Sequence, residues 1–598
     1  MSHGAAVAIH RSEPITSPAE HNRLKRSEAA ENLDHRWRAG FAAALGGLSP
    51  WAALQAWEDW AFHLTTSPGQ LLDLCNLSVY NGLILSQFHL NHMSGGTAEC
   101  PFTPEESDRR FRDHAWCSSP YNLYAQTHLA LEAQWDAASK AVRGVDPHHL
   151  NRVNFLGRWI LNAMAPVNFA LTNPTVVQAA SKSLGMNFVV GATQLLDDTM
   201  RLAGQQRLRA LDDFKVGENL ANTPGLVVYR NALMEVIQYA PTTDKVHAEP
   251  ILIVPAWIMK YYILDLTPEQ SLVRYLVEAG FTVFIISWKN PDQDIRDASM
   301  DDYRKRGVME AMGVVQSIVP DQKIHAVGYC LGGTILSIAA AAMDRDDDKR
   351  LASLSLLAAQ TDFVDAGELM LFIDHSQLAI LEDFMHIRGY LEAHQMASAF
   401  QSLRANELIW SQLVSRYLLG EPAHITPLDA WLADPTRMPE RMQGEYLRDL
   451  FLENRLSRST ILVDGRAIAL QDIRTPLFAL GAERDHIAPW RSVYKVVLYT
   501  SADTTFVLSG GGHNSSVISP PDKAGAYYRM SESQASTAYI DPDQWLGRTS
   551  VRKGSWWPQW VKWLERRGSH THIVPPPYGS RDPAKPFEAA PGAYVLER

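Results

Sequence analysis

The sequence predicts an α/β protein in which a mostly helical N-terminal region precedes a parallel β-sheet. Two observations support this class. Between about residues 37 and 209, apolar residues recur three and four positions apart, as in LALEAQWDAASKAV, which is typical of amphipathic helices. After about residue 216, short β-branched runs alternate with helical segments. Such alternation is the pattern of parallel strands joined by crossover helices.

Strands are expected in the short apolar segments of the second region: MEVIQYA, PILIVPAWI, FTVFIISW, KIHAVGY, LASLSLLA, PLFALGA and TTFVLSG. Between the second and third strands, TPEQSLVRYLVEAG predicts a helix with Thr267 as N-cap and Pro268 at its first position. Gln270 completes a capping box, and Gly280 ends the helix. DDYRKRGVMEAMGVVQSIV supplies the next crossover helix.

The domain organisation follows from these patterns. Residues 1–36 are polar, show no sustained period and predict a flexible arm. A helical domain over 37–215 and an α/β domain over 216–570 follow, and the proline-rich residues 571–598 predict an extended tail that wraps the surface. Within the α/β domain, helical sequence rich in large apolar residues interrupts the alternation at about 362–470. We interpret this insertion as a cap over an active site, with an ordinary helical packing layer as the alternative.

Composition excludes several classes of function. The net charge of −11 and the pI near 6.0 give no bulk attraction to nucleic acid or to an anionic membrane. The four cysteines form no close pair and no cluster with histidine at zinc spacing, so neither a disulfide framework nor a metal site is expected. The histidines of the N-terminal region are scattered, which favours surface or core positions over ligand roles. No signal peptide and no membrane span are expected, which predicts a cytoplasmic protein.

The segment GYCLGG, between a predicted strand and a predicted helix, has the pattern of a nucleophile elbow. Such an elbow needs small residues at Gly328 and Gly332, and Gly333 continues the glycine run. It places Cys330 at the top of the sheet and directs the N–H of Leu331 toward a developing oxyanion. A buried structural cysteine between glycines is the alternative. The flanking strand and helix favour the elbow and predict an α/β-hydrolase fold.

In this fold the acid and the base follow the nucleophile at later strand ends. PLFALGAERDHIAPW places Asp485 after one strand, and TTFVLSGGGHNSS places His513 after the next. The alternative is that Asp485 caps a helix and His513 is a loop residue. His486 is interpreted as an orienting or packing residue, and His325 lies inside a predicted strand.

A cysteine nucleophile suits acyl transfer. Paired with His513, Cys330 would offer a thiolate near neutral pH. Attack of a thiolate on a thioester gives another thioester of similar energy, so the acyl group keeps its reactivity. A dry, capped site would then protect it from water.

With these residues in place, the chain resembles the polyhydroxyalkanoate synthases of the long single-subunit type. The similarity runs from about residue 108 to 566 and includes DRRF, FALTNP, FKVGENLANTPGLVVYRN, IQYAPTT, KYYILDLTPEQSLVRYLVEAGFTVFIISWKNPD, GYCLGG, RDHIAPW and GGHN. Their joint occurrence at family spacing is highly specific. The resemblance implies that Cys330, Asp485 and His513 are the catalytic triad.

The resemblance also implies a substrate, a product and partners. The substrate would be an (R)-3-hydroxyacyl-coenzyme A, such as 3-hydroxybutyryl-coenzyme A, and the product a polyester with release of coenzyme A. No cofactor is implied, because the coenzyme A thioester is itself a substrate. Family members form dimers and reside on polyester granules. An apolar cap that includes Trp410 and Trp431 is compatible with both properties. The implied roles leave open whether Asp485 or His513 activates the 3-hydroxyl group.

The chain departs from the family pattern at two places. The loop PAWIMKYY has Ala256 and Met259 where relatives have proline and asparagine, and this loop is expected to supply the second oxyanion N–H, from Trp257 or Ile258. After the histidine, an Asn-Ser pair replaces an apolar pair.

Two other functions stay open from the sequence. They are a thioesterase or polyester depolymerase, although no G-x-S-x-G occurs, and a non-catalytic granule-associated partner of an active synthase.

Overall fold

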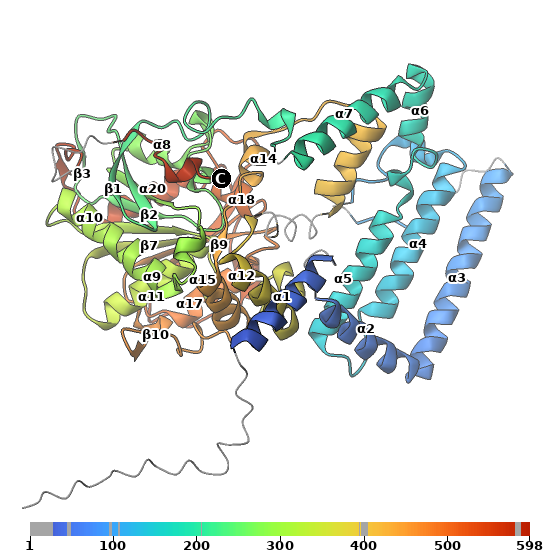
Figure 1. Cartoon of the computed structure of the whole chain (residues 1–598), viewed down its shortest axis with the longest axis horizontal. Helices are drawn as coiled ribbons and strands as arrows, with labels where there is room; N and C mark the ends of the chain where they lie inside the picture. Colours follow the sequence, from blue (N-terminus) through green and yellow to red (C-terminus); the bar gives the residue numbers. More distant parts are fainter. Residues whose placement is uncertain are drawn as a thin grey trace, which may run out of the picture.

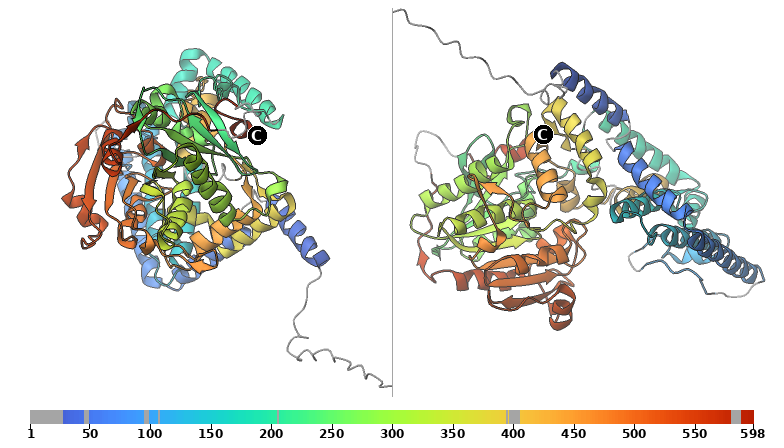
Figure 2. Two further views of the ribbon diagram at one scale, coloured as in Figure 1. Left: turned by 90° about the vertical axis from the view of Figure 1, so that its left-hand side faces the viewer. Right: turned by 90° about the horizontal axis from the view of Figure 1, so that it is seen from below.

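The computed structural model describes residues 28–44, 49–94, 99–105, 108–204, 206–393, 395, 405–579 and 588–598. A lobe of long helices from the N-terminal half lies beside a lobe built around a β-sheet (Figure 1). The same two lobes stand side by side when the molecule is seen from below (Figure 2). The sheet, as expected, follows the helical region in sequence.

The described N-terminal region is built from helices of 10 to 26 residues. They are α1 (Glu28–Ala44), α2 (Pro50–Thr65), α3 (Pro68–Met93), α4 (Tyr121–Ser139), α5 (Pro147–Ala163), α6 (Pro174–Ser183) and α7 (Met186–Ala203). Three of them begin with a side-chain N-cap followed by proline, which needs no N–H at the first helical position. Helix α1 starts at Glu28, so the arm predicted for 1–36 ends too late; residues 1–27 lie outside the described residues.

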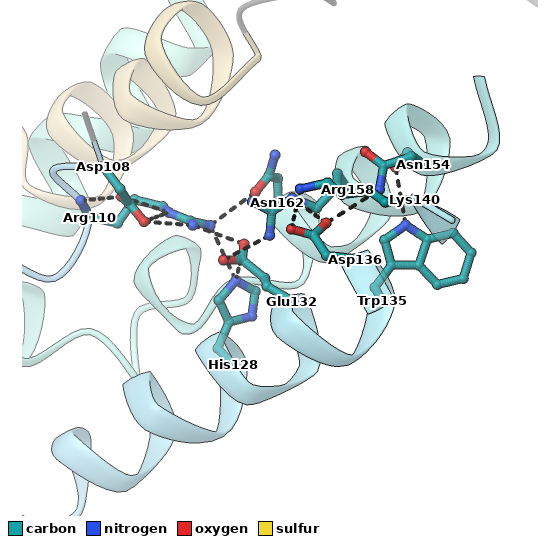
Figure 3. Close-up of polar contacts among 10 residues, drawn as sticks. All are labelled: Asp108, Arg110, His128, Glu132, Trp135, Asp136, Lys140, Asn154, Arg158 and Asn162. Carbon is teal, nitrogen blue, oxygen red and sulfur yellow. Dashed lines mark hydrogen bonds and ion pairs between the residues drawn. The ribbon is translucent and has the colours of Figure 1, made fainter. Parts of the chain in front are cut away.

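The DRRF segment anchors itself to helix α4 through a polar network (Figure 3). Arg110 donates to Asp108 Oδ1 at 3.0 Å through Nε and to Glu132 Oε1 at 2.9 Å through Nη2. His128 lies 3.1 Å from the same Glu132 oxygen, and Arg158 lies 3.1 Å from the other. Burial would raise the pKa of Glu132, but the His128 hydrogen bond and the charges of Arg110 and Arg158 lower it to about 2. The carboxylate is therefore charged and satisfied at neutral pH.

The sheet of the second lobe has the strand order β1-β2-β5-β4-β6-β7-β12-β13-β14-β15 among the described residues. Its strands are β1 (Gly225–Arg230), β2 (Met234–Tyr239), β4 (Ile251–Val254), β5 (Val283–Trp288), β6 (Ile324–Tyr329), β7 (Leu351–Leu357), β12 (Leu477–Ala482), β13 (Thr504–Ser509), β14 (Tyr527–Ser533) and β15 (Arg552–Lys553). The strands from β5 to β13 in this order pair in parallel. Their carboxyl ends therefore meet at one edge.

All seven expected strands are present, and two local expectations differ from the structure. At the two ends of the sheet, β1, β14 and β15 were not predicted, and β2, which was expected in a parallel sheet, pairs antiparallel with β1 and β5. The helix predicted from Thr267 begins later: Pro268–Gln270 form a 3₁₀ turn, and α8 (Leu272–Glu278) takes Ser271 as its N-cap. The Ser271 hydroxyl accepts the N–H of Arg274, so the capping box proposed for Thr267 and Gln270 is wrong.

Helices cover both faces of the sheet. Alternate residues of β4 point to opposite sides: Leu252 and Val254 join one core cluster, and Ile251 and Ile253 join the other. The first face packs against α10 (Glu310–Ile318), α11 (Leu331–Arg345) and α16 (Trp490–Tyr494). The second packs against α8 and α20 (Trp557–Arg567). Shorter helices are α9 (Met300–Asp302), which runs into the π-helical η7 (Tyr303–Met309), α17 (Val496–Tyr499), α18 (His513–Val517) and α19 (Pro542–Arg548).

The predicted insertion is helical and lies between β7 and β12. It contains α12 (His375–Arg388), η9 (Asn406–Trp410), η10 (Leu413–Leu418), α14 (Pro427–Leu432), α15 (Glu440–Glu445) and η11 (Tyr446–Leu452). It also connects the two lobes. The Asn187 side chain donates to the carbonyl of Leu418 at 2.7 Å, and His35 of α1 lies 2.5 Å from the buried carboxylate of Asp383.

Small β-pairs complete the fold: β3 (Val246–His247) with β16 (His572–Ile573), β8 (Tyr390–Leu391) with β9 (Met438–Pro439), and β10 (Leu462–Val463) with β11 (Arg466–Ala467). The C-terminal residues return to the sheet, where the N–H of Val227 donates to the carbonyl of Glu588 at 2.8 Å. Val595 is only 2% exposed. The end of the chain is thus built into the core and does more than wrap the surface.

Candidate active site

Cys330 stands at the turn between strand β6 and helix α11. Its backbone has φ 53° and ψ −125°, a conformation that costs a non-glycine residue about 1–3 kcal/mol. The N–H of Cys330 donates to the carbonyl of Leu357 at 2.9 Å, and its carbonyl accepts the N–H of Gly333 at 2.9 Å. These bonds hold the strained turn, and the side chain remains partly exposed. The geometry is that of a nucleophile elbow.

The glycines around Cys330 are required by close approach. A Cβ atom on Gly328 would lie 2.3 Å from the Cα of Gly333, and one on Gly333 would lie 2.4 Å from the Cβ of Ala359. A Cβ on Gly332 would lie 2.0 Å from the carbonyl oxygen of Val254. No side chain fits at these distances. The contact of Gly332 also brings the end of β4 directly against the elbow.

Asp485 and His513 come together at the same edge of the sheet. Asp485 follows β12, and His513 begins α18 after β13. His513 Nδ1 lies 2.7 Å from Asp485 Oδ2, and the other carboxylate oxygen accepts the N–H groups of Ile487 and Ala488 at 2.9 Å each. Because the carboxylate only accepts, Nδ1 carries the proton. Cys330 lies close enough to the imidazole for its charge to act on the pKa of His513.

The charges of Asp485 and Cys330 act on the pKa of the His513 imidazole. Burial alone would lower the pKa of His513, but the charges of Asp485 and Cys330 and the hydrogen bonds to both raise it well above 6.5. The imidazole of His513 is thus bonded to the Asp485 carboxylate and lies within the electrostatic reach of Cys330.

Two tyrosines contribute to the site and were not expected from sequence. The hydroxyl of Tyr329 donates to Asn514 Oδ1 at 2.6 Å, and this bond connects the residue before Cys330 with the residue after His513. The Tyr329 ring centre lies 5.7 Å from that of His513. Tyr446 comes from the insertion; burial and then the nearby charge of Cys330 raise its pKa. Adjacency to Cys330 and His513 could have indicated Tyr329 and Asn514, whereas nothing local indicated Tyr446.

The backbone groups expected to bind an oxyanion lie around Cys330. Leu331 is the first residue of α11, so its N–H lies among those without an acceptor inside the helix. Trp257 and Ile258 are buried in the loop after β4, which Gly332 touches at Val254. Thr436 of the insertion fixes this loop: its hydroxyl donates to the carbonyl of Trp257 at 2.6 Å, and its N–H donates to that of Ile258 at 3.3 Å.

The two residues by which the loop after β4 departs from the family pattern have identifiable surroundings. Ala256 is 5% exposed and belongs to the core, and Met259 forms a β-bridge with Pro435 of the insertion. Trp431 also contacts this loop, since its indole N–H donates to the carbonyl of Lys260 at 2.8 Å. The other predicted cap tryptophan, Trp410, lies elsewhere. Its ring centre is 6.3 Å from that of Trp159 in α5, at the boundary of the helical lobe.

The remaining histidines that the sequence analysis considered lie outside this chemistry. His325 is buried within β6, where its Nδ1 lies 2.7 Å from the hydroxyl of Ser353 and burial lowers its pKa to about 4. The backbone carbonyl of His486 accepts the N–H of Glu368 at 3.0 Å. Across the residues that the structure describes, no three His, Cys, Asp or Glu side chains are grouped to hold a metal ion. No helix in this part of the chain is long and apolar enough to cross a membrane.

Comparison with known proteins agrees with the geometry. Residues 28–70 and 107–276 match the family models described as the N terminal of poly-beta-hydroxybutyrate polymerase and the N-terminus of poly-beta-hydroxybutyrate polymerase (PhaC). Residues 249–520 match the alpha/beta hydrolase fold. The poly(3-hydroxyalkanoate) polymerase subunit PhaC of Rhizobium meliloti (strain 1021) is 37% identical over 514 residues, which cover 85% of this chain and 83% of that protein.

The chain belongs to the poly(3-hydroxyalkanoate) polymerase family. The poly(3-hydroxyalkanoate) polymerase of Methylorubrum extorquens is 36% identical over 509 residues, covering 85% of this chain and 83% of the relative. The PhaC subunit of Cupriavidus necator is 35% identical over 511 residues, covering 84% and 85%. The family resemblance and the α/β-hydrolase fold predicted from sequence are thereby confirmed. The similarity to poly(3-hydroxyalkanoate) polymerases extends over both lobes.

Proposed function

We propose that this chain polymerises (R)-3-hydroxyacyl-coenzyme A into a polyester through an acyl thioester on Cys330, with release of coenzyme A. The observation that carries the proposal is the arrangement of Cys330 at its strained turn and of His513, 2.7 Å from Asp485, at the carboxyl ends of strands of one sheet. The relatives are named poly(3-hydroxyalkanoate) polymerases, and their similarity covers both lobes. Both observations favour the same chemistry.

In the first step, the Cys330 thiolate attacks the thioester carbonyl of the substrate. The N–H of Leu331 and one N–H of the loop at Trp257 and Ile258 stabilise the tetrahedral oxyanion. The intermediate collapses by breaking the bond between carbon and the coenzyme A sulfur, and the leaving thiolate takes the proton held on His513. The products are free coenzyme A and a hydroxyacyl group on Cys330, and His513 is left neutral.

In the second step, neutral His513 removes the proton from the 3-hydroxyl of an incoming hydroxyacyl-coenzyme A. The hydroxyl oxygen attacks the Cys330 thioester, an ester bond forms, and the Cys330 thiolate leaves. The thiolate then attacks the coenzyme A thioester of the lengthened chain and releases coenzyme A with the proton from His513. Each cycle thus adds one ester and frees one coenzyme A.

His513, rather than Asp485, is the base for the hydroxyl in this proposal. Asp485 already accepts two backbone N–H groups on one oxygen and the His513 N–H on the other. Its side chain is 0% exposed, compared with 6% for His513. Nε2 of His513, the ring nitrogen that does not face Asp485, is therefore available to a hydroxyl group, whereas both carboxylate oxygens already accept hydrogen bonds.

The surroundings support a water-poor site and an apolar partner surface. Tyr446 and Thr436 of the insertion lie over Cys330 and the oxyanion loop, as expected of a cap. In the helical lobe, α3 and α7 expose many large apolar side chains: Leu72, Val79, Tyr80, Leu83, Leu90 and Met93 on α3, and Met186, Val189, Leu195, Leu196, Met200 and Leu202 on α7. We propose that the protein resides in the cytoplasm on the granule surface, as a homodimer.

Coenzyme A release with (R)-3-hydroxybutyryl-coenzyme A, followed by isolation of insoluble polyester, tests the function. The expected result is release together with polymer, and loss of both in Cys330→Ala. Release of coenzyme A with free hydroxyacid and no polymer would replace the proposal with a thioesterase. No release from this substrate or from longer hydroxyacyl chains would leave the non-catalytic granule partner.

A further inference from the structure

The last residues of the chain form a clasp against the loop that follows β4. We use the name C-terminal clasp for residues 593–598, which include the 3₁₀ turn η13 (Tyr594–Leu596). Glu235 of β2, fully buried, accepts the N–H groups of Ala593 and Tyr594 at 3.2 Å each. Val595, 2% exposed, inserts into the core. The clasp is therefore held by a charged cap and an apolar anchor.

Lys260 joins this clasp to the loop after β4. Its ammonium group donates to the backbone carbonyl of Glu597 at 2.6 Å and to that of Tyr594 at 3.4 Å. The Glu597 carboxylate in turn accepts the N–H of Asn290 at 3.0 Å, in the loop after β5. The clasp thus bridges two of the loops at the carboxyl edge of the sheet.

Burial makes these bonds necessary for the position of Lys260. The residue is 3% exposed, and burial lowers the pKa of its amine, against the opposing charges of Asp434 and Glu597. A buried ammonium without hydrogen-bond acceptors would be strongly destabilising. The two carbonyls of the clasp accept hydrogen bonds from the buried amine and so offset part of the cost of its burial.

Lys260 lies only two positions after Ile258 in the loop expected to donate an N–H to the oxyanion. The backbone of this loop is held from the cap side as well, through Thr436 on the carbonyls of Trp257 and Ile258 and through Trp431 on the carbonyl of Lys260. The loop is therefore clamped between the insertion and the C-terminal clasp. A shift of about 1 Å in such a group can lower a rate by about a hundredfold.

We propose that Lys260 and the C-terminal clasp position the loop of Trp257 and Ile258 for stabilisation of the oxyanion. Lys260 is a positioning residue: it acts through the loop backbone and does not touch the substrate. The inference rests on the proposed function, because it concerns attack on a thioester. Residues 593–598 thus contribute to the position of an oxyanion donor, although they lie far from it in sequence.

Two reactions of Cys330 separate this role from a general structural one. Attack on a thioester forms an oxyanion, whereas alkylation by iodoacetamide displaces iodide from a saturated carbon and forms none. We expect Lys260→Met, and a chain ending at Leu596, to slow single-turnover coenzyme A release by about tenfold to a hundredfold. The rate of Cys330 alkylation should stay within about twofold of the parent, because the Cys330–His513 contact is unchanged. The exposed Lys245→Met serves as the matched control and should change neither rate.

The two perturbations share the hydrogen bond from Lys260 to the carbonyl of Glu597, so the loss in the double variant should be smaller than the product of the two single losses. Equal losses in coenzyme A release and alkylation, or losses that multiply in the double variant, would overturn the inference. So would a Lys260→Met protein that releases coenzyme A at the parent rate. A parent protein that is alkylated at Cys330 but releases no coenzyme A would refute the proposed function, and the inference with it.

Discussion

Replacing Asp485 with asparagine tests how the structure activates Cys330. Asparagine is nearly isosteric, and its side-chain oxygen can still accept the N–H groups of Ile487 and Ala488. Its NH₂ group would then face His513 Nδ1, which now lies 2.7 Å from a carboxylate oxygen. A donor at this position requires Nδ1 to lose its proton, so the proton moves to Nε2. In that tautomer, the nitrogen facing Cys330 can no longer accept a proton.

The expected size follows from the loss of the correct tautomer and of the carboxylate charge. In other catalytic triads the same exchange lowers kcat by about 10⁴, so we expect a loss of about 10³–10⁴ in kcat/KM, or about 4–5.5 kcal/mol at 1.36 kcal/mol per tenfold. The charge of Asp485 is one of the causes that raise the pKa of His513. Its removal lowers that pKa, so alkylation of Cys330 at neutral pH should slow as well.

Both quantities can be measured on one preparation, by coenzyme A release and by iodoacetamide alkylation across pH 6–9. Asp522→Asn, an exposed position beyond α18, is the matched control and should behave as the parent. A folded Asp485→Asn protein that retains more than about a tenth of the parent kcat/KM would refute the tautomer reasoning, because a misplaced proton cannot leave the rate nearly intact.

Three further substitutions have defined outcomes. Tyr329→Phe removes the 2.6 Å hydrogen bond to Asn514 and should lower kcat about tenfold with little change in melting temperature, as measured by coenzyme A release and calorimetry. An unchanged kcat would exclude a role for this bond. Gly332→Ala places a Cβ 2.0 Å from a backbone oxygen and should destabilise by about 3 kcal/mol or more, whereas Gly313→Ala, with nothing within 4 Å, should stabilise α10 by about 0.5–1 kcal/mol. Equal melting temperatures for these two variants would contradict the close-approach argument. Glu132→Gln removes the carboxylate charge that Arg110 and Arg158 share, although Asp108 and Asp136 still pair with them, and should destabilise by about 1.5–3 kcal/mol at pH 7. Because the Glu132 pKa is lowered from 4.5 to about 2, this penalty should hold from pH 7 to pH 5 and shrink below 4.5; a penalty that shrinks already between pH 7 and pH 5 would refute the assignment.

The sequence predicted the central strands well because both of their faces are buried, which leaves uninterrupted apolar runs between turn signals. It failed at the sheet edges and at the start of α8. There, Ser271 and Thr267 both offer a capping hydroxyl, and the choice depends on tertiary packing. Ser271 is also hydrogen-bonded to the buried carboxylate of Asp265 at 2.7 Å. No local pattern contains that contact.

The candidate site also contains residues that the sequence predicted and residues that it did not. Cys330, Asp485 and His513 follow three strands of one parallel sheet, so chain order and strand ends were enough to expect them together. Tyr446 and Thr436 arrive from the insertion, and the partner of Lys260 arrives from the end of the chain. These contacts follow neither the strand order nor a local motif, and the packing of the folded core sets them, so a single sequence could not indicate them.

The most direct measurement is peptide mass spectrometry of the protein quenched in acid after mixing with (R)-3-hydroxybutyryl-coenzyme A. We predict a hydroxyacyl or oligomeric adduct on the peptide that contains Cys330. Hydroxylamine should remove this adduct, and Cys330→Ala should not form it. Cys75, Cys100 and Cys117, all exposed, provide internal controls and should stay unmodified. Coenzyme A release with no adduct on Cys330, or an adduct that persists in Cys330→Ala, would contradict the covalent mechanism.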